Sequence, residues 1–199
     1  MIYAKVDPPN YNFSLEAFDL FKPGSSVEEI KKKYPKAEVV DQKTESSVIK
    51  VYVAHLRYRF PVFIQTHRDK TVDFIARLPN YFLHDLFHQT LINRYGKQDK
   101  YFKKEESALY VWRGEKDGIK RVYYGTCTIT FFPVYYSEMM VAPPSELGTD
   151  YKTLLAQFEN SVLEKLGPEI SQAPPPPKIT ATPTSASEAQ TASQTGIKP

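Results

Sequence analysis

The chain has 199 residues, 41% of them hydrophobic and 14% aromatic, and its formal net charge is +3. This composition predicts one or two folded domains, and the weak charge, with acidic and basic residues interleaved, argues against nucleic-acid binding. The single cysteine, Cys127, excludes an intramolecular disulfide and any metal site that needs several cysteines.

A repeated pattern sets the order of the predicted elements. Residues 33–38 (Lys-Tyr-Pro-Lys-Ala-Glu) return 61 residues later as 94–99 (Arg-Tyr-Gly-Lys-Gln-Asp). Residues 43–48 return at the same distance as 104–109, and in both places a helical pattern precedes the match and β-rich sequence follows it. Because self-similarity at a fixed period indicates tandem structural units, we expect two copies of one helix-plus-sheet unit.

The first copy, about 12–78, opens with a predicted helix. Ser26 and Glu29 have the spacing of a capping box, which marks a helix start. The basic triplet 31–33 follows at the end of this helix, where positive charge is favourable, and we predict a solvated face there. The strands predicted after the helix are 37–41, 47–54, 57–66 and 70–78.

The second copy, about 79–136, has the same predicted order. Asn80 is a candidate N-cap, and the helix continues to Tyr95 and ends at Gly96. We expect the two copies to form one α+β domain over residues 1–136, with one continuous antiparallel sheet and the helices on one face. The strands predicted in the second copy are 99–103, 107–113 and a paired region across 119–132.

Three segments follow the predicted sheet domain. A linker is expected at 137–148, where two adjacent prolines interrupt the pattern. Residues 149–167 have the spacing of an amphipathic helix with Thr149 as a candidate N-cap, and we expect its apolar stripe to dock on the domain. Residues 172–199 contain four consecutive prolines and few large apolar residues, which predicts a disordered spacer.

The sequence does not identify one compartment and leaves two interpretations open. No apolar run reaches the length of a transmembrane helix, and the first residues lack the pattern of a signal peptide. We therefore expect a cytoplasmic protein as the chain is written, or a protein of the periplasm or cell envelope if a leader has been removed.

Alternation along the strands separates two faces of the predicted sheet. Apolar residues at every second position, such as Val51, Val62 and Ala76, are expected to face the core. Cys127 falls in the core set of its strand and is predicted to be a small buried hydrophobe. The outward set contains arginine together with aromatic and aliphatic residues: Arg57, Arg59, Phe63, Ile75, Arg77, Val111, Arg113 and Tyr124.

This outward set is the candidate partner-binding site. Guanidinium groups mixed with aromatic and aliphatic side chains are typical of protein interfaces. Two other interpretations remain open, namely an ordinary solvated face and a face covered by the 149–167 helix.

Two histidines are weak candidates for metal ligands. His84 and His88 stand at positions i and i+4 of the predicted second helix, a spacing that can hold one metal ion. The sequence shows no clear third ligand, and His88 aligns with Val27, on the stripe that faces the sheet. We therefore predict a structural role for His88, with no cofactor, no metal site and no catalytic residue.

The start of the first helix resembles a known family. Residues 24–30 (Gly-Ser-Ser-Val-Glu-Glu-Ile) are similar to the helix start Gly-x-Ser/Thr-x-x-x-Val/Ile of the β-lactamase-inhibitor-protein-like superfamily, and Tyr95-Gly96 is similar to its helix end. This group includes small outer-membrane assembly lipoproteins that carry a single copy. The resemblance covers about 12–136 and implies a non-enzymatic protein that binds other proteins through its sheet face and loops, often in the cell envelope.

These observations lead to one expected function and two alternatives. We expect a non-enzymatic protein-binding or scaffold module that uses the outward sheet face, with another protein as its partner. The alternatives are a small-ligand-binding α+β cup, in which the helices close over a curved sheet, and a metal-dependent hydrolase built on His84 and His88.

Overall fold

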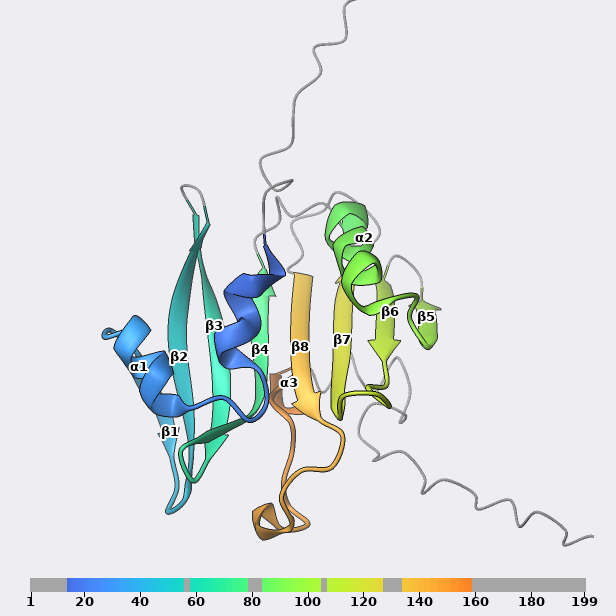
Figure 1. Ribbon diagram of the computed structural model, residues 1–199. Coiled ribbons are helices and arrows are strands. Elements are labelled where there is room, and N and C mark those ends of the chain that lie inside the picture. Colours follow the sequence, from blue (N-terminus) through green and yellow to red (C-terminus); the bar gives the residue numbers. More distant parts are fainter. Residues whose placement is uncertain (1–13, 56–57, 79–83, 105–106, 127–133, 159–199) are drawn as a thin grey trace, which may run out of the picture.

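A computed structural model describes residues 14–55, 58–78, 84–104, 107–126 and 134–158. In these residues an eight-stranded antiparallel sheet has the strand order β1-β2-β3-β4-β8-β7-β6-β5 (Figure 1). The strands are β1 (Glu38–Gln42), β2 (Ser46–His55), β3 (Tyr58–His67), β4 (Lys70–Leu78), β5 (Lys100–Lys104), β6 (Ser107–Trp112), β7 (Ile119–Thr126) and β8 (Val134–Met140).

Each half of the sheet follows a helix in the chain. Helix α1 (Val27–Lys33) precedes β1 to β4, and helix α2 (His84–Tyr95) precedes β5 to β8. Consecutive strands pair within each half, and the halves meet where β4 pairs with β8. The fold is therefore a mixed α+β fold in which the sheet dominates. The α+β class agrees with the prediction from the sequence.

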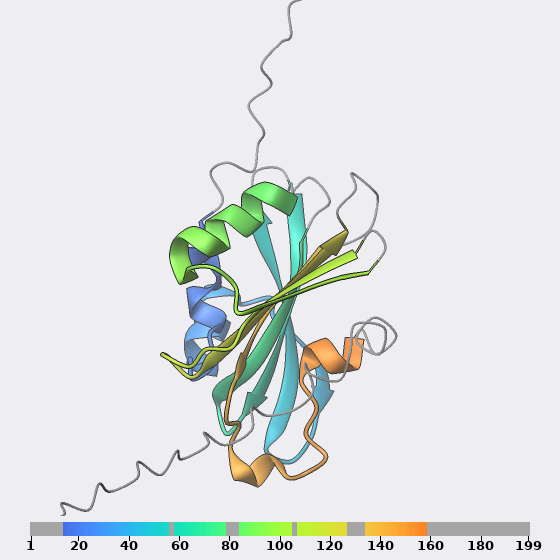
Figure 2. The ribbon, with the colours of Figure 1, turned by 90° about the vertical axis from the view of Figure 1, so that its right-hand side faces the viewer.

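One face of the sheet carries the main core. The 3-10 helix η2 (Leu15–Phe21), α1 and α2 all lie on this face (Figure 2). Phe18 of η2 is 1% exposed, and its ring centroid lies 5.4–6.3 Å from those of Phe60, Phe74 and Tyr136. Aromatic contacts of this kind stabilise a core beyond the area that they bury.

The predicted alternation is confirmed in the strands that form this core. η2 is not predicted from the sequence, although Leu15, Phe18 and Phe21 recur at every third residue, which is the period of a 3-10 helix. The buried inward residues of the strands include Ile49, Val51, Val53, Phe60, Val62, Ile64, Phe74, Ala76, Leu78, Tyr110, Trp112 and Tyr123.

The opposite face is partly covered by the C-terminal segment. Helix α3 (Leu154–Phe158) lies on the side of the sheet away from η2, α1 and α2 (Figure 2). Leu154 and Leu155 are buried in a second apolar cluster with Ile75, Val111 and Met139. The expected docking of the amphipathic stripe is therefore confirmed for the described part of this helix.

Two predicted boundaries differ from the structure. β8 continues to Met140 at the centre of the sheet, so a linker that starts at 137 cuts into a core strand. Polar residues in this strand weaken its apolar pattern. α3 begins at Leu154 and not at 149, because Oγ1 of Thr153 accepts a hydrogen bond from the Ala156 N–H and caps the helix there.

Several predictions fall outside the described residues. They concern Cys127 and the strand region beyond 126, the helix beyond 158, and the tail at 172–199. Of the helices that the structure does describe, none combines the length and the apolar character needed to cross a bilayer.

Candidate functional site

The outward set predicted from the sequence does not form one accessible surface. Ile75 and Val111 are buried, at 2% and 4% exposure, in the apolar cluster that includes the α3 leucines. Phe63 and Tyr124 are half-buried at the margin of the same cluster, and Arg57 lies outside the described residues. A partner cannot reach the two buried residues while α3 is docked, which corresponds to the covered face considered from the sequence.

The three arginines that are exposed in this set lie apart. Arg59 is at the start of β3, Arg77 is near the end of β4, and Arg113 directly follows β6. β3 starts and β6 ends at opposite ends of the sheet (Figure 1). Arg59 and Arg113 therefore belong to separate surfaces, and of the three only Arg59 lines a pocket described below.

A buried carboxylate fixes the C-terminal segment to the sheet. Asp73 of β4 is 0% exposed and accepts hydrogen bonds from the Tyr151 hydroxyl and, at 3.4 Å, from the Leu154 N–H. With its amide turned to satisfy both groups, Gln65 donates to Asp73 Oδ2 and to the Lys152 carbonyl, each at 3.2 Å. Burial raises the pKa of Asp73 to about 7, although the bond from Tyr151 acts in the opposite direction.

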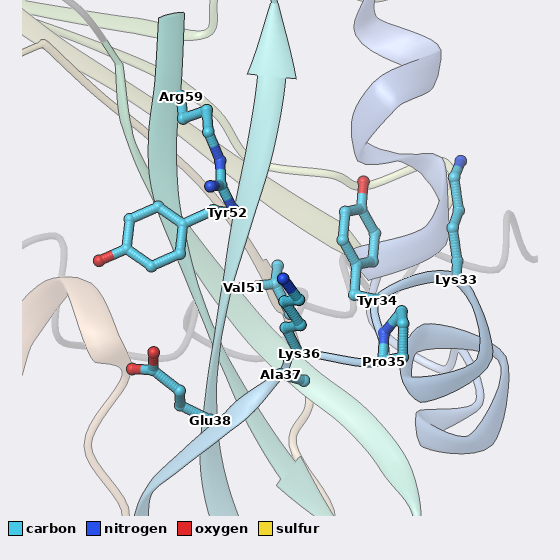
Figure 3. Close-up of a pocket in the computed structure, with 9 residues that line it drawn as sticks. All are labelled: Lys33, Tyr34, Pro35, Lys36, Ala37, Glu38, Val51, Tyr52 and Arg59. Carbon is cyan, nitrogen blue, oxygen red and sulfur yellow. The ribbon is translucent and has the colours of Figure 1, made fainter.

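A pocket of about 520 Å³ opens at the β1 edge of the sheet (Figure 3). The turn between α1 and β1 forms one wall, and it closes through a 2.9 Å hydrogen bond from the Ala37 N–H to the Tyr34 carbonyl. The Tyr34 ring packs 5.5 Å from that of Phe21, which holds the turn against the core. We call this site the first-half pocket; it is lined by Lys33, Tyr34, Pro35, Lys36, Ala37, Glu38, Val51, Tyr52 and Arg59.

Cations outnumber acids in the first-half pocket. Lys33, Lys36 and Arg59 line it, and none of them has an acidic partner among the residues that the structure describes. Glu38 is the acid of the lining, and it is already bonded to Lys50, with Nζ and Oε2 3.0 Å apart. The pocket therefore presents positive charge to solvent.

Tyr52 is the exposed aromatic residue of the pocket, at 38%. The guanidinium carbon of Arg59 lies 5.3 Å from the centroid of its ring, and Nζ of Lys50 lies 4.9 Å from it. Contacts with Tyr52 and Glu38 raise the pKa of Lys50. These cation–π contacts hold the ring and the two charges in place relative to one another.

The second half has a pocket at the corresponding place. It measures about 530 Å³ and lies between the turn after α2, with Tyr95, and the end of β6, with Trp112. Nε1 of Trp112 donates to the Gly96 carbonyl at 2.8 Å, which fixes the turn to the strand. The two segments that match in the sequence, 33–38 and 94–99, supply the corresponding walls of the two pockets. We call this site the second-half pocket.

A buried charge network lies beside the second-half pocket. Arg121 is 4% exposed, its Nη2 lies 2.7 Å from Asp117 Oδ2, and its guanidinium carbon lies 3.9 Å from the centroid of the Tyr95 ring. Behind it, Glu138 is 1% exposed and accepts hydrogen bonds from the hydroxyls of Tyr95 and Tyr136. Burial would lower the pKa of Arg121, but the hydrogen bond to Asp117 and the charge of Glu138 raise it overall. Burial, with the charge of Glu138, also raises the pKa of Tyr136.

His88 packs against the sheet, as its alignment with Val27 predicts. Its ring centroid lies 3.9 Å from that of Tyr110 on the inner face, with Trp112 close by. The side chain of His84 is outside the described part of the structure. Among the residues that the structure describes, no three potential ligands gather to hold a metal ion. His88 is thus part of the aromatic packing between α2 and the sheet.

Comparisons with known proteins give no match. No protein-family model, curated protein or solved structure matches the chain. The resemblance to the β-lactamase-inhibitor-protein-like superfamily stays a prediction.

Two residues of the first-half pocket, Lys36 and Tyr52, are not singled out from the sequence, and Lys33 is predicted to lie on a solvated face. A signal was present in the repeat, because the segments 33–38 and 94–99 match over a turn and not over a core strand. A sequence match over a turn is such a signal because binding residues lie on surface loops more often than on core strands.

Proposed function

We propose that the protein is a non-enzymatic module that binds another protein, and that the first-half pocket is its binding site. The observation that carries this proposal is the group of three cations, Lys33, Lys36 and Arg59, that have no acidic partner in the described residues and that line a pocket together with exposed Tyr52. Exposed charges contribute little to folding stability. Arginine and tyrosine, by contrast, are enriched among the residues that dominate protein interfaces.

We also infer that the two halves are copies of one unit, as the sequence match and the family resemblance imply. The register at the centre of the sheet supports this inference. Ile75 of β4 pairs with Ser137 of β8, which lies about one 61-residue period further along the chain. Two equivalent strands that meet across a pseudo-two-fold axis require a central residue to face its own counterpart in this way.

The structure favours the alternatives less. A ligand cup needs space between the helices and the sheet, and on the inner face Phe18, Phe21 and Phe87 fill that layer. A metal-dependent hydrolase would need His88 as a ligand, and its ring lies against Tyr110.

Charge reversal at Arg59 tests the proposed binding site. The matched control is Arg113→Glu, which reverses an exposed arginine at the other end of the sheet. Wild type and both variants are immobilised and exposed to native cell extract, and the captured proteins are identified by mass spectrometry. We expect a partner that the wild type and Arg113→Glu retain and that Arg59→Glu loses, with the same thermal unfolding midpoint for all three. Equal capture by all three would count against the first-half pocket.

A further inference from the structure

β2 extends beyond its edge neighbour at the first-half pocket. It pairs with β3 as far as His55, but its pairing with β1 ends where Lys50 faces Glu38. Before Glu38 the chain leaves the sheet edge, because the turn 34–37 connects to α1. Residues 51–55 therefore have a strand neighbour on one side, and the N–H and C=O groups of every second residue point to the open side.

The cations of the pocket lie on both faces of this open edge. Lys33 ends α1, on the face of the sheet that the helices cover (Figure 3). Arg59 and Tyr52 lie on the opposite face, since their chain neighbours Phe60 and Val51 point into the core. The alternating side chains of an added strand would meet positive charge on both faces.

We infer that the partner binds through an acidic peptide segment, which adds to β2 as an extended strand beside residues 51–55. This inference rests on the proposed function of the first-half pocket and specifies its partner. Main-chain hydrogen bonds to an open sheet edge give such peptides their affinity, and neighbouring side chains give the selectivity. At about 3.3 Å per residue, the open edge accommodates roughly five peptide residues.

Charge complementarity and backbone chemistry together favour a peptide over a nucleic acid. A single strand of DNA or RNA also offers negative charge, and its bases could stack on Tyr52. It does not offer the alternating N–H and C=O groups that residues 51–55 can pair with. A protein segment with glutamate or aspartate at adjacent positions satisfies both the edge and the cations.

Synthetic peptides test strand addition directly. The probe is a fluorescein-labelled heptapeptide, Thr-Glu-Glu-Val-Glu-Glu-Thr, whose binding to the full chain is measured by fluorescence anisotropy. Two further versions carry N-methyl groups on alternate residues, one on the odd set and one on the even set, so that each removes one row of N–H donors without changing the charge. A thymidine oligonucleotide with four phosphates serves as the nucleic-acid probe.

We expect the heptapeptide to bind and one of the two methylated versions to lose binding, because only one row of N–H groups faces β2. Arg59→Glu should weaken the peptide by about tenfold or more, and Arg113→Glu should leave its Kd within about twofold. Hydrogen exchange of the amides in residues 51–55 should slow when the peptide is bound.

The outcomes separate this inference from the proposed function. If both methylated peptides bind as well as the parent, charge alone attracts the ligand and strand addition is overturned, while the pocket remains the site. Binding of the oligonucleotide but not the heptapeptide overturns the peptide inference and the protein-binding function together. If Arg59→Glu abolishes capture of a partner from extract but the heptapeptide does not bind, the inference of an acidic added strand is overturned and the proposed binding site is retained.

Discussion

The two pockets lie at corresponding places in the two halves, yet the arginines in them differ in whether they have acidic partners. In the first-half pocket, Lys33 and Arg59 have no acidic partner among the described residues. On the second-half side, Arg121 is held by Asp117 and Glu138, and Arg94 is bonded to Asp19 of η2 with Nη2 and Oδ1 2.8 Å apart. The same turn and strand end thus support two different electrostatic arrangements.

This difference implies that some charged residues can serve binding while others serve the stability of the fold. Removing an exposed charge changes the free energy of unfolding little, so such charges are available to a partner. Removing one member of a buried ion pair leaves the other charge buried without compensation, which destabilises the fold strongly. The proposal that the first-half pocket binds a partner therefore rests on the lack of an acidic partner for Arg59 in the described part of the chain, and not on the place of the pocket in the sheet.

The largest expected effect is the loss of the buried arginine. Arg121→Met should lower the free energy of unfolding by about 3–5 kcal/mol, because Glu138 stays buried without its cation. Arg59→Met should change it by no more than about 0.5 kcal/mol. Urea denaturation of both variants measures the contrast. The double variant Arg121→Met/Glu138→Leu is the control, since removing both charges should restore part of the loss. Similar small effects of both single substitutions would remove the distinction between the pockets.

A pH series should separate the pocket from the C-terminal segment. Asp73 has a pKa of about 7 when folded, against an ordinary value of 3.8, so between these values the folded state holds a proton that the unfolded state has lost. Stability should therefore fall as pH rises from about 4 to about 7, by up to about 4 kcal/mol.

Urea denaturation between pH 4 and 8 follows this change, and Asp73→Asn should remove most of the pH dependence. Peptide binding at the first-half pocket should stay constant from pH 6 to 8, because Asp73 lies outside this pocket and the glutamates of the peptide are ionised over this range. A wild-type stability that is flat over this range would show that Asp73 is ionised at low pH or is not buried.

Salt should give the smallest of these effects. Raising the ionic strength from about 0.05 M to about 0.5 M should weaken heptapeptide binding by roughly tenfold, because the cations of the first-half pocket are exposed and screened. The contribution of Arg121 to stability should respond less, because buried pairs are screened less. Peptide binding that is insensitive to salt would indicate that the pocket cations do not contact the ligand.

The faces of the sheet could be predicted because strand alternation is a local pattern. Val51, Phe60 and Phe74 need only the two-residue period of a strand to be assigned to the core. The burial of Asp73 and Glu138 could not be predicted in this way. Each is an ionisable residue whose partners include groups from distant parts of the chain, and such pairings leave no local trace in the sequence.

The first-half pocket escaped prediction for a related physical reason. Lys33 ends a basic triplet at a helix C-terminus, where positive charge is favourable in any protein. Whether Lys33 is available to a partner depends on which cations the nearby acidic residues pair with. Glu38 forms its ion pair with Lys50, across the β1–β2 pair. The sequence match at 33–38 indicates where the turn lies. It does not show that the β1–β2 pairing takes up the acidic residue of the pocket, Glu38.

The pairing of β4 with β8 also has a kinetic consequence. The other described strand pairs join consecutive strands, whereas this one brings together residues such as Asp73 and Met139 across the whole second half of the domain. Hairpins close short loops at a small entropic cost, so each half can form early during synthesis, and the central seam closes last. A fragment that stops at residue 136 would lose most of β8 and leave β4 as an open edge prone to self-association. A fragment meant for expression should therefore extend past Met140 and include α3.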